Sequence, residues 1–128
     1  MNDKKSRRNT LIIEAAAVIL WLTVIAILIH HHVKTTFTEK KWLEYPDERT
    51  HIVQDLIEKH KLIGMTEEEV TALLGPESRT DSFNGGMGKF YPAETTLIYY
   101  IGSDSSNRMW LILPLEGGAV QDIVTEIT

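Results

Sequence analysis

Histidines are the first residues in this chain whose type and spacing suggest chemistry. His30, His31 and His32 form a short tract of a kind that binds transition metals. Consecutive residues on a helix point about 100° apart, so the three rings cannot share one ion unless the helix has ended. We therefore interpret the tract as a polar stop at a membrane interface.

Two further histidines lie in a predicted helix. His51 and His60 are nine residues apart, which places them on opposite faces and excludes a chelating pair. His51 and Asp55 have the i,i+4 spacing of a side-chain contact, which is most often solvated.

Two loops resemble ligand-binding motifs without completing them. The stretch from Asn84 to Phe90 is glycine-rich, but a phosphate-binding loop would need glycine at 83 and a hydroxyl at 90, and both are Phe. We predict a hairpin connection there. Ser103 to Asn107 lacks the downstream glycine and bidentate glutamate of a calcium loop, so we predict a plain turn.

No set of residues has the spacing of a nucleophile with its base, a metal centre or a cofactor loop. The chain has no cysteine, which excludes a thiol nucleophile, a disulfide scaffold and a Cys-ligated zinc. We therefore expect no enzymatic activity, and we assign no catalytic, cofactor-binding or metal-binding residue.

The elements around these residues begin with an apolar run. Residues 11–29 contain one charge, Glu14, and as a helix they would span about 28 Å, close to the hydrocarbon core of a bilayer. A cleaved signal peptide is the competing interpretation, but small residues around a cleavage site are missing after Ile29. We favour a retained transmembrane helix, with Glu14 reaching to the interface.

Basic residues predict the orientation of this helix. Four of them lie between Lys4 and Arg8, directly before the apolar run, against Lys34, Lys40 and Lys41 after it. The positive-inside rule then makes residues 1–10 a cytoplasmic tail and places the C-terminal part outside the cytoplasm. The expected location is thus the cell membrane, in a single pass.

Residues 30–45 are predicted to form a juxtamembrane linker. Its aromatic residues, Phe37, Trp42 and Tyr45, are mixed with lysines, as in an interfacial belt. A stalk whose Trp42 packs on the following domain is the alternative, and the sequence leaves both open. From residue 33 onward nine Lys and Arg face sixteen Asp and Glu, a net charge of −7, which argues against a nucleic-acid partner.

Residues 46–128 carry the pattern of one small domain. A helix is expected from Pro46 to about His60, with an apolar stripe at Ile52, Val53, Leu56 and Ile57.

A second helix begins at Thr66, whose side chain caps the Glu69 amide while Glu69 returns a bond to the Thr66 amide. Met65 and Val70 occupy the staple positions, and Gly75 ends the helix in a left-handed conformation before Pro76.

Strand patterns follow, with strands expected at 78–83, 95–101, 109–115 and 119–127. The fold class is therefore α+β, an N-terminal transmembrane helix followed by two short helices packed on a four-stranded antiparallel sheet.

The domain resembles small bacterial envelope proteins of the SmpA/OmlA (BamE-like) type, which share a fold with β-lactamase-inhibitor-like domains. The motifs that carry this resemblance are Trp42, 47–49, 55–57, 62–70, 73–76, 99–102, 110–112 and 117–120. The chain departs from outer-membrane members because it lacks a lipid-accepting cysteine and has an anchor. The resemblance implies a helix pair on an antiparallel sheet and brings no catalytic set.

We expect an extracytoplasmic protein-interaction module anchored in the lipid bilayer through residues 11–29, with a protein partner in the cell envelope. The alternative is a binding or sensing domain for a small ligand or cell-wall fragment, through Tyr99, Tyr100 or Trp110 if they are exposed. Core packing is the more common role of such large rings in a small sheet. Inhibition of a secreted enzyme is a third hypothesis, based on fold analogy alone.

Overall fold

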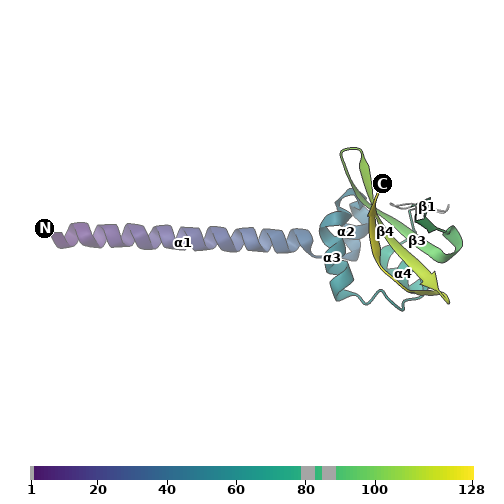
Figure 1. The fold of residues 1–128 in the computed structure, drawn as a ribbon. Helices are drawn as coiled ribbons and strands as arrows, with labels where there is room; N and C mark the ends of the chain where they lie inside the picture. Colours follow the sequence, from purple (N-terminus) through teal and green to yellow (C-terminus); the bar gives the residue numbers. More distant parts are fainter. Residues whose placement is uncertain (1, 79–82, 85–88) are drawn as a thin grey trace. The chain divides into compact units, whose positions relative to one another are not determined.

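The computed structural model describes residues 2–78, 83–84 and 89–128, which form two compact units divided between Thr35 and Thr36. Unit 1 is residues 1–35 and unit 2 is residues 36–128. Figure 1 shows the secondary structure of both.

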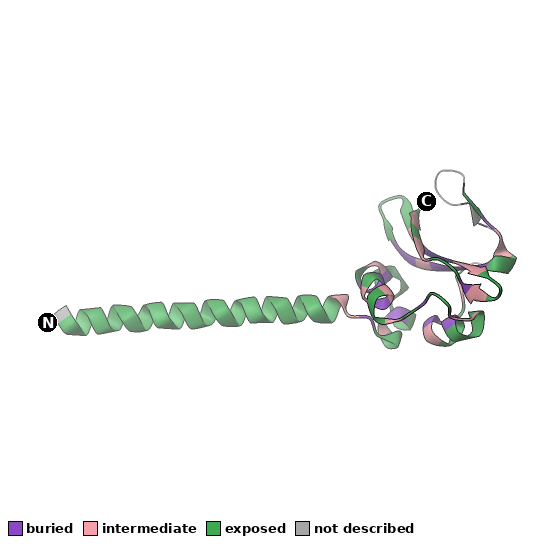
Figure 2. Cartoon of the chain, turned by 60° about the horizontal axis from the view of Figure 1, so that its bottom comes forward, coloured by how far each residue is buried: buried purple, intermediate pink, exposed green. Residues whose placement is uncertain are grey.

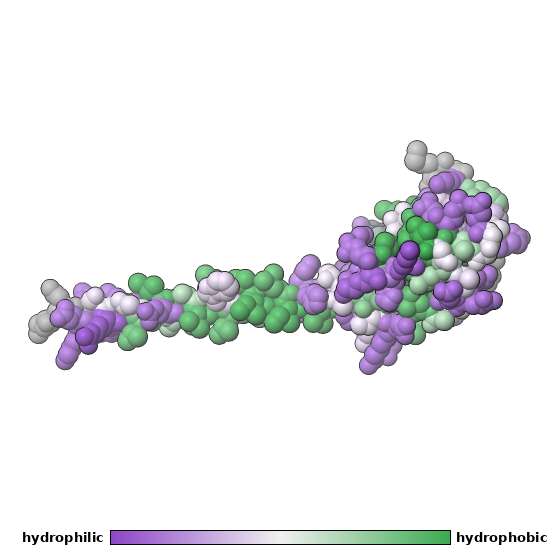
Figure 3. Space-filling model, turned by 90° about the horizontal axis from the view of Figure 1, so that it is seen from below, coloured by the Kyte–Doolittle hydropathy of each residue, from purple (hydrophilic) through white to green (hydrophobic). Residues whose placement is uncertain are grey.

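Unit 1 is a single helix, α1, which runs from Asn2 to Thr35. It contains the predicted apolar run and is long and apolar enough to cross a membrane. Residues 3–34 of α1 are exposed (Figure 2), and hydrophobic residues occupy its middle between hydrophilic ends (Figure 3). His30 to His32 remain helical, so the three rings point in different directions.

Unit 2 begins with three short helical elements: α2 (Glu39–Glu44), η1 (Pro46–Glu48) and α3 (Arg49–Lys59). The unit starts at Thr36, earlier than the expected domain boundary at Pro46. The reason is that Phe37 and Trp42 belong to its hydrophobic core, where Trp42 is fully buried. The sequence left open whether Trp42 lies in an interfacial belt or packs on the domain, and in the structure it packs on the domain.

The fourth helix, α4 (Glu67–Leu74), has the predicted start and end. The Glu69 amide donates to the Thr66 hydroxyl at 3.2 Å, and Met65 and Val70 lie in one core cluster. The Glu69 side chain was expected to accept from the Thr66 amide. It accepts instead from the Thr66 hydroxyl, at Oε1 and 3.2 Å. Gly75 has φ 78° and ψ −171°, a conformation essentially restricted to glycine.

The sheet has four antiparallel strands: β3 (Thr96–Asp104), β4 (Asn107–Glu116), β5 (Ala119–Val120) and β6 (Val124–Ile127). β3 pairs with one side of β4, while β5 and β6 pair in succession with the other side. The expected strand at 119–127 is thus interrupted, because Val120 pairs with Leu115 but Val124 pairs with Ile112. One extra residue between these pairs bends the strand, as in a bulge.

Of the expected strand at 78–83, the described residues include only Ser78 and Phe83, and neither is part of a strand of this sheet. Phe83–Asn84 form β1, which pairs with β2 (Phe90–Tyr91) in a separate two-stranded ribbon, and residues 79–82 lie outside the described residues. In Figure 1, α2 and α3 lie on one side of the sheet and β1 on the other.

Both faces of the sheet carry buried side chains. Leu97, Tyr99, Ile101, Leu111 and Leu113 pack against the helices on what we call the helix face. Ile98, Trp110 and Ile112 form a smaller cluster with Tyr91 on the opposite face. The predicted α+β class is confirmed, and alternation along β3 and β4 produces the two faces.

Candidate protein-interaction surface

The two histidines of unit 2 do not form a site. His51 Nε2 lies 3.2 Å from Glu48 Oε2 rather than beside Asp55. His60 packs its ring against Phe37, with the ring centroids 5.2 Å apart. Asp55 instead accepts a hydrogen bond from the Phe37 amide at 2.6 Å and pairs with Lys59 at 3.1 Å. Within the described residues, no group of three His, Asp or Glu side chains is placed to hold a metal ion.

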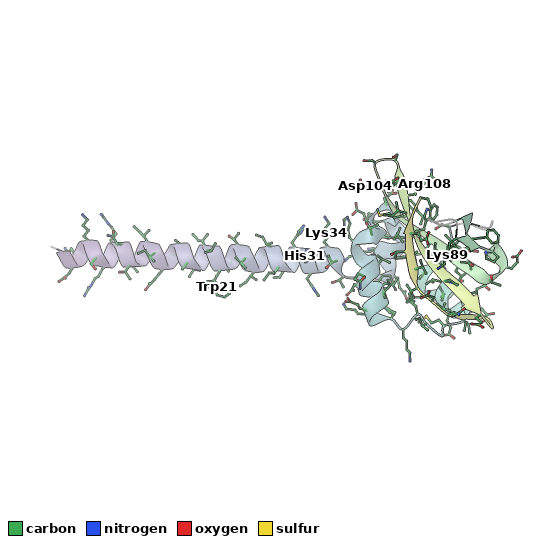
Figure 4. All side chains as sticks on the ribbon, in the orientation of Figure 1. Trp21, His31, Lys34, Lys89, Asp104 and Arg108 are labelled. Atoms are coloured by element: carbon green, nitrogen blue, oxygen red, sulfur yellow. The ribbon has the colours of Figure 1, made fainter. Side chains whose placement is uncertain are left out.

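The predicted turn at 103–107 is the tip of the β3–β4 hairpin. Asp104 pairs with Asn107, and Ser105 has φ 51°. Asp104 and Arg108 lie near this tip in Figure 4. The tip is exposed, which agrees with a plain turn.

Most of the glycine-rich stretch, residues 85–88, lies outside the described residues. Lys89, which follows it, places its Nζ 5.8 Å from the centroid of the Tyr91 ring.

The aromatic residues proposed for ligand binding serve the fold. Tyr99 is fully buried, and its hydroxyl donates to the Gly75 carbonyl at 2.9 Å. Burial raises the pKa of Tyr99 to about 12. Trp110 is 5% exposed and donates from Nε1 to Thr128 Oγ1 at 2.8 Å. Tyr100 is half-buried and donates from its hydroxyl to Asp47 Oδ1 at 2.7 Å, so its polar atom also has a partner within the domain.

The sequence did not reveal that Arg49, three positions before the first residue of the predicted stripe, is buried. Arg49 donates from Nε to the Trp42 carbonyl at 2.7 Å and from Nη1 to the Tyr100 carbonyl at 2.9 Å. Its guanidinium lies 4.6 Å from the centroid of the Trp42 ring. Burial lowers the pKa of Arg49, which nevertheless stays cationic at neutral pH.

A groove of about 340 Å³ opens between α3 and β6 on the helix face. Thr50, Val53, Gln54 and Ile57 form its wall on α3, where their spacing places them on one side of the helix. Ile101 and Met109 also line the groove, from β3 and β4, and Thr125, Glu126 and Ile127 line it from β6. The lining is therefore largely apolar but open to solvent: Ile127 is 61% exposed.

The outer edge of β6 lies beside this groove. Arg108 and Thr128 exchange both backbone hydrogen bonds, at 2.8 Å each. Because hydrogen-bonded pairs alternate in an antiparallel ladder, the backbone groups of residues 124 and 126 also face β4. Those of Thr125 and Ile127 point away from the sheet, and among the described residues no partner pairs with them.

The other sheet edges are covered. At the edge of β3, Ser78 donates from its amide to the Ile98 carbonyl at 2.8 Å, and Glu77 Oε2 accepts from the Ile98 amide at 3.0 Å. At β5, the Gly64 amide donates to the Val120 carbonyl and the Val120 amide donates to the Met65 carbonyl, at 2.8 Å each. Thr66 forms a β-bridge with Ala119. Among these three edges in the described part of the chain, that of β6 is open to pairing.

Neither a family model, nor a curated protein, nor a solved structure matches this chain. The resemblance to SmpA/OmlA-like proteins therefore stays a prediction from the sequence.

Proposed function

We propose that the chain is a membrane-anchored protein-interaction module of the bacterial cell envelope, without catalytic activity. Residues 11–29 would hold it in the cell membrane in a single pass, with residues 1–10 in the cytoplasm and unit 2 outside. The apolar length of α1 supports the anchor, and the cluster of basic residues before it supports the orientation.

The observation that carries the proposal is the open, largely apolar groove beside the uncovered edge of β6. Apolar surface that is left accessible next to a free strand edge is a common feature of docking sites for other proteins.

Small-ligand sensing is less well supported, since Tyr99 and Trp110 are buried and use their polar atoms inside the fold. A protein surface is the better match for an open groove whose lining combines apolar side chains with Thr, Gln and Glu.

Chemical crosslinking in intact membranes, followed by affinity purification of the full chain, tests this function. The matched control is an anchor-only protein in which residues 1–35 carry an unrelated soluble domain. We expect a protein partner that the full chain captures and the anchor-only control does not. Capture of identical partners by both proteins would contradict the proposal.

The same preparation tests the absence of catalysis. The variants His51→Ala, His60→Ala, Ser103→Ala and Asp104→Ala should each retain the partner, because none of these residues lines the groove or belongs to β6. A hydrolytic or transfer activity of the full chain that any one of them abolishes would establish an enzyme instead.

A further inference from the structure

We propose that β6 accepts an extended peptide segment of a basic partner protein as an added antiparallel or parallel strand, with apolar side chains of that segment in the groove beside α3. This inference rests on the proposed function and specifies its surface and its mode of recognition.

The backbone of β6 requires an extended partner. Thr125 and Ile127 each direct one N–H and one C=O away from β4, so a neighbouring strand can satisfy up to four backbone groups. A helix or a small apolar molecule would leave these groups to water. An added strand is therefore the occupant that matches their spacing.

The groove determines which side chains this strand carries. The side chains of Thr125 and Ile127 lie on the helix face, because they stand opposite Leu111 and Met109 on β4. In a strand added next to β6, every second side chain lies on the same face, at the open side of the groove. There it meets Ile127 and the wall formed by Gln54 and Ile57. Alternate aliphatic residues would cover this apolar surface.

Charge distinguishes a foreign segment from a second copy of this chain. Unit 2 contains eight Lys and Arg against sixteen Asp and Glu, a net charge of −8. On the α3 wall, the Gln54 amide donates to Glu58 Oε1 at 3.1 Å, so an exposed carboxylate adjoins the groove. Two copies of unit 2 would repel one another, whereas Lys or Arg residues flanking the added strand would be attracted.

The experiment uses the full chain in lipid nanodiscs and a defined peptide pool. Its peptides are about nine residues long, with Val, Ile, Leu or Phe at alternate positions, Thr between them and two Lys at each end. We expect binding that is about tenfold weaker to Thr125→Pro, equivalent to about 1.4 kcal/mol. The proline removes one outward N–H and obstructs the edge, while it leaves the bonds between β6 and β4 in place.

N-methylation of the best peptide provides a test that leaves the protein unchanged. Methyl groups on the alternate amides that face β6 should abolish binding, and methyl groups on the other set of amides should leave it within about twofold of the parent. Replacement of the flanking Lys residues by Glu should weaken binding.

Three outcomes would overturn the inference: equal enrichment of the pool on wild type and Thr125→Pro, equal effects of the two methylation patterns, or a dimer of the full chain that Thr125→Pro dissociates. If the pool does not bind while crosslinking still captures a partner, the proposed function stands and only this mode of recognition fails.

Discussion

Replacement of Trp42 tests whether residues 36–45 are part of the folded domain. The Trp42 side chain is fully buried, and its Nε1 donates to the Leu74 carbonyl at 3.0 Å. It also packs edge-on against Phe37 and Tyr99, with ring centroids 6.0 and 6.1 Å away, and it carries the guanidinium of Arg49 on its ring face. One side chain therefore joins α2 to α3, α4 and the sheet.

The expected loss for Trp42→Ala is large. A buried tryptophan replaced by alanine costs about 3–5 kcal/mol through lost burial and the cavity that remains. The Leu74 carbonyl loses its donor, and the buried guanidinium of Arg49 loses its aromatic contact, so the upper half of this range is expected. For a domain of this size, a loss of about 4 kcal/mol lowers Tm by about 16–32 °C. Trp42→Phe keeps most of the packing and should cost about 1–3 kcal/mol, mainly through the lost hydrogen bond.

Thermal unfolding of the full chain in detergent, followed by near-ultraviolet circular dichroism, measures this loss. Near-ultraviolet signals report the packed aromatic residues, whereas the far-ultraviolet signal would include α1. Tyr45→Ala is the matched control, because Tyr45 lies in the same segment but is 56% exposed. It should change the free energy of unfolding by less than about 0.5 kcal/mol. Equal effects of Trp42→Ala and Tyr45→Ala would refute the reasoning and make the segment a linker.

Four further predictions concern the cap, the helix end, a carboxyl group and the topology. Thr66→Ala should cost about 1 kcal/mol in urea unfolding by removing the cap of the Glu69 amide, and an unchanged midpoint would contradict that role. Gly75→Val should cost more than Thr66→Ala in the same assay, because φ is 78° and an added Cβ would lie 2.8 Å from Leu43 Cδ2. Burial raises the pKa of the Glu77 carboxyl in the folded protein, so Glu77 favours the fold below the unfolded pKa of 4.5, and this contribution is lost as pH rises through the folded pKa. Glu77→Gln should therefore gain stability relative to wild type as pH rises. A relative gain as pH falls would contradict the raised pKa. Protease added outside intact cells should digest unit 2, whereas protection that only lysis removes would place unit 2 in the cytoplasm.

Features encoded within a few neighbouring residues were predictable from the sequence. The cap at Thr66 and the positive φ at Gly75 depend on local backbone geometry, and both are present. β3 ends at Asp104 and β4 begins at Asn107, so both strands continue further toward their shared turn than predicted. The polar residues 103–107 indicate a longer turn than the one that forms.

Features that depend on distant partners were not predictable. Helix α2 has six residues, too few for a periodic pattern, and it is held by the contact of Trp42 with Leu74, 32 residues away. Arginine is usually found at the surface, but Arg49 is held by the backbone carbonyls of Trp42 and Tyr100. Backbone carbonyls occur at every residue, so the sequence does not indicate which of them Arg49 binds.

The groove has a partial signal in the sequence. Thr50, Val53, Gln54 and Ile57 repeat at helical spacing beside the predicted stripe. The open edge of β6 has no such signal, because it results from the interrupted return strand and its pairing with β4.

The most direct test of protein recognition by unit 2 is photo-crosslinking in living cells from position 54. Gln54 is exposed on the α3 wall of the groove, and Glu68, exposed on α4, is the control position for the same photoreactive residue. We predict a protein adduct of discrete mass from position 54 that Thr125→Pro removes and that position 68 does not form. Identical adducts from both positions, or no protein adduct from position 54, would contradict the account.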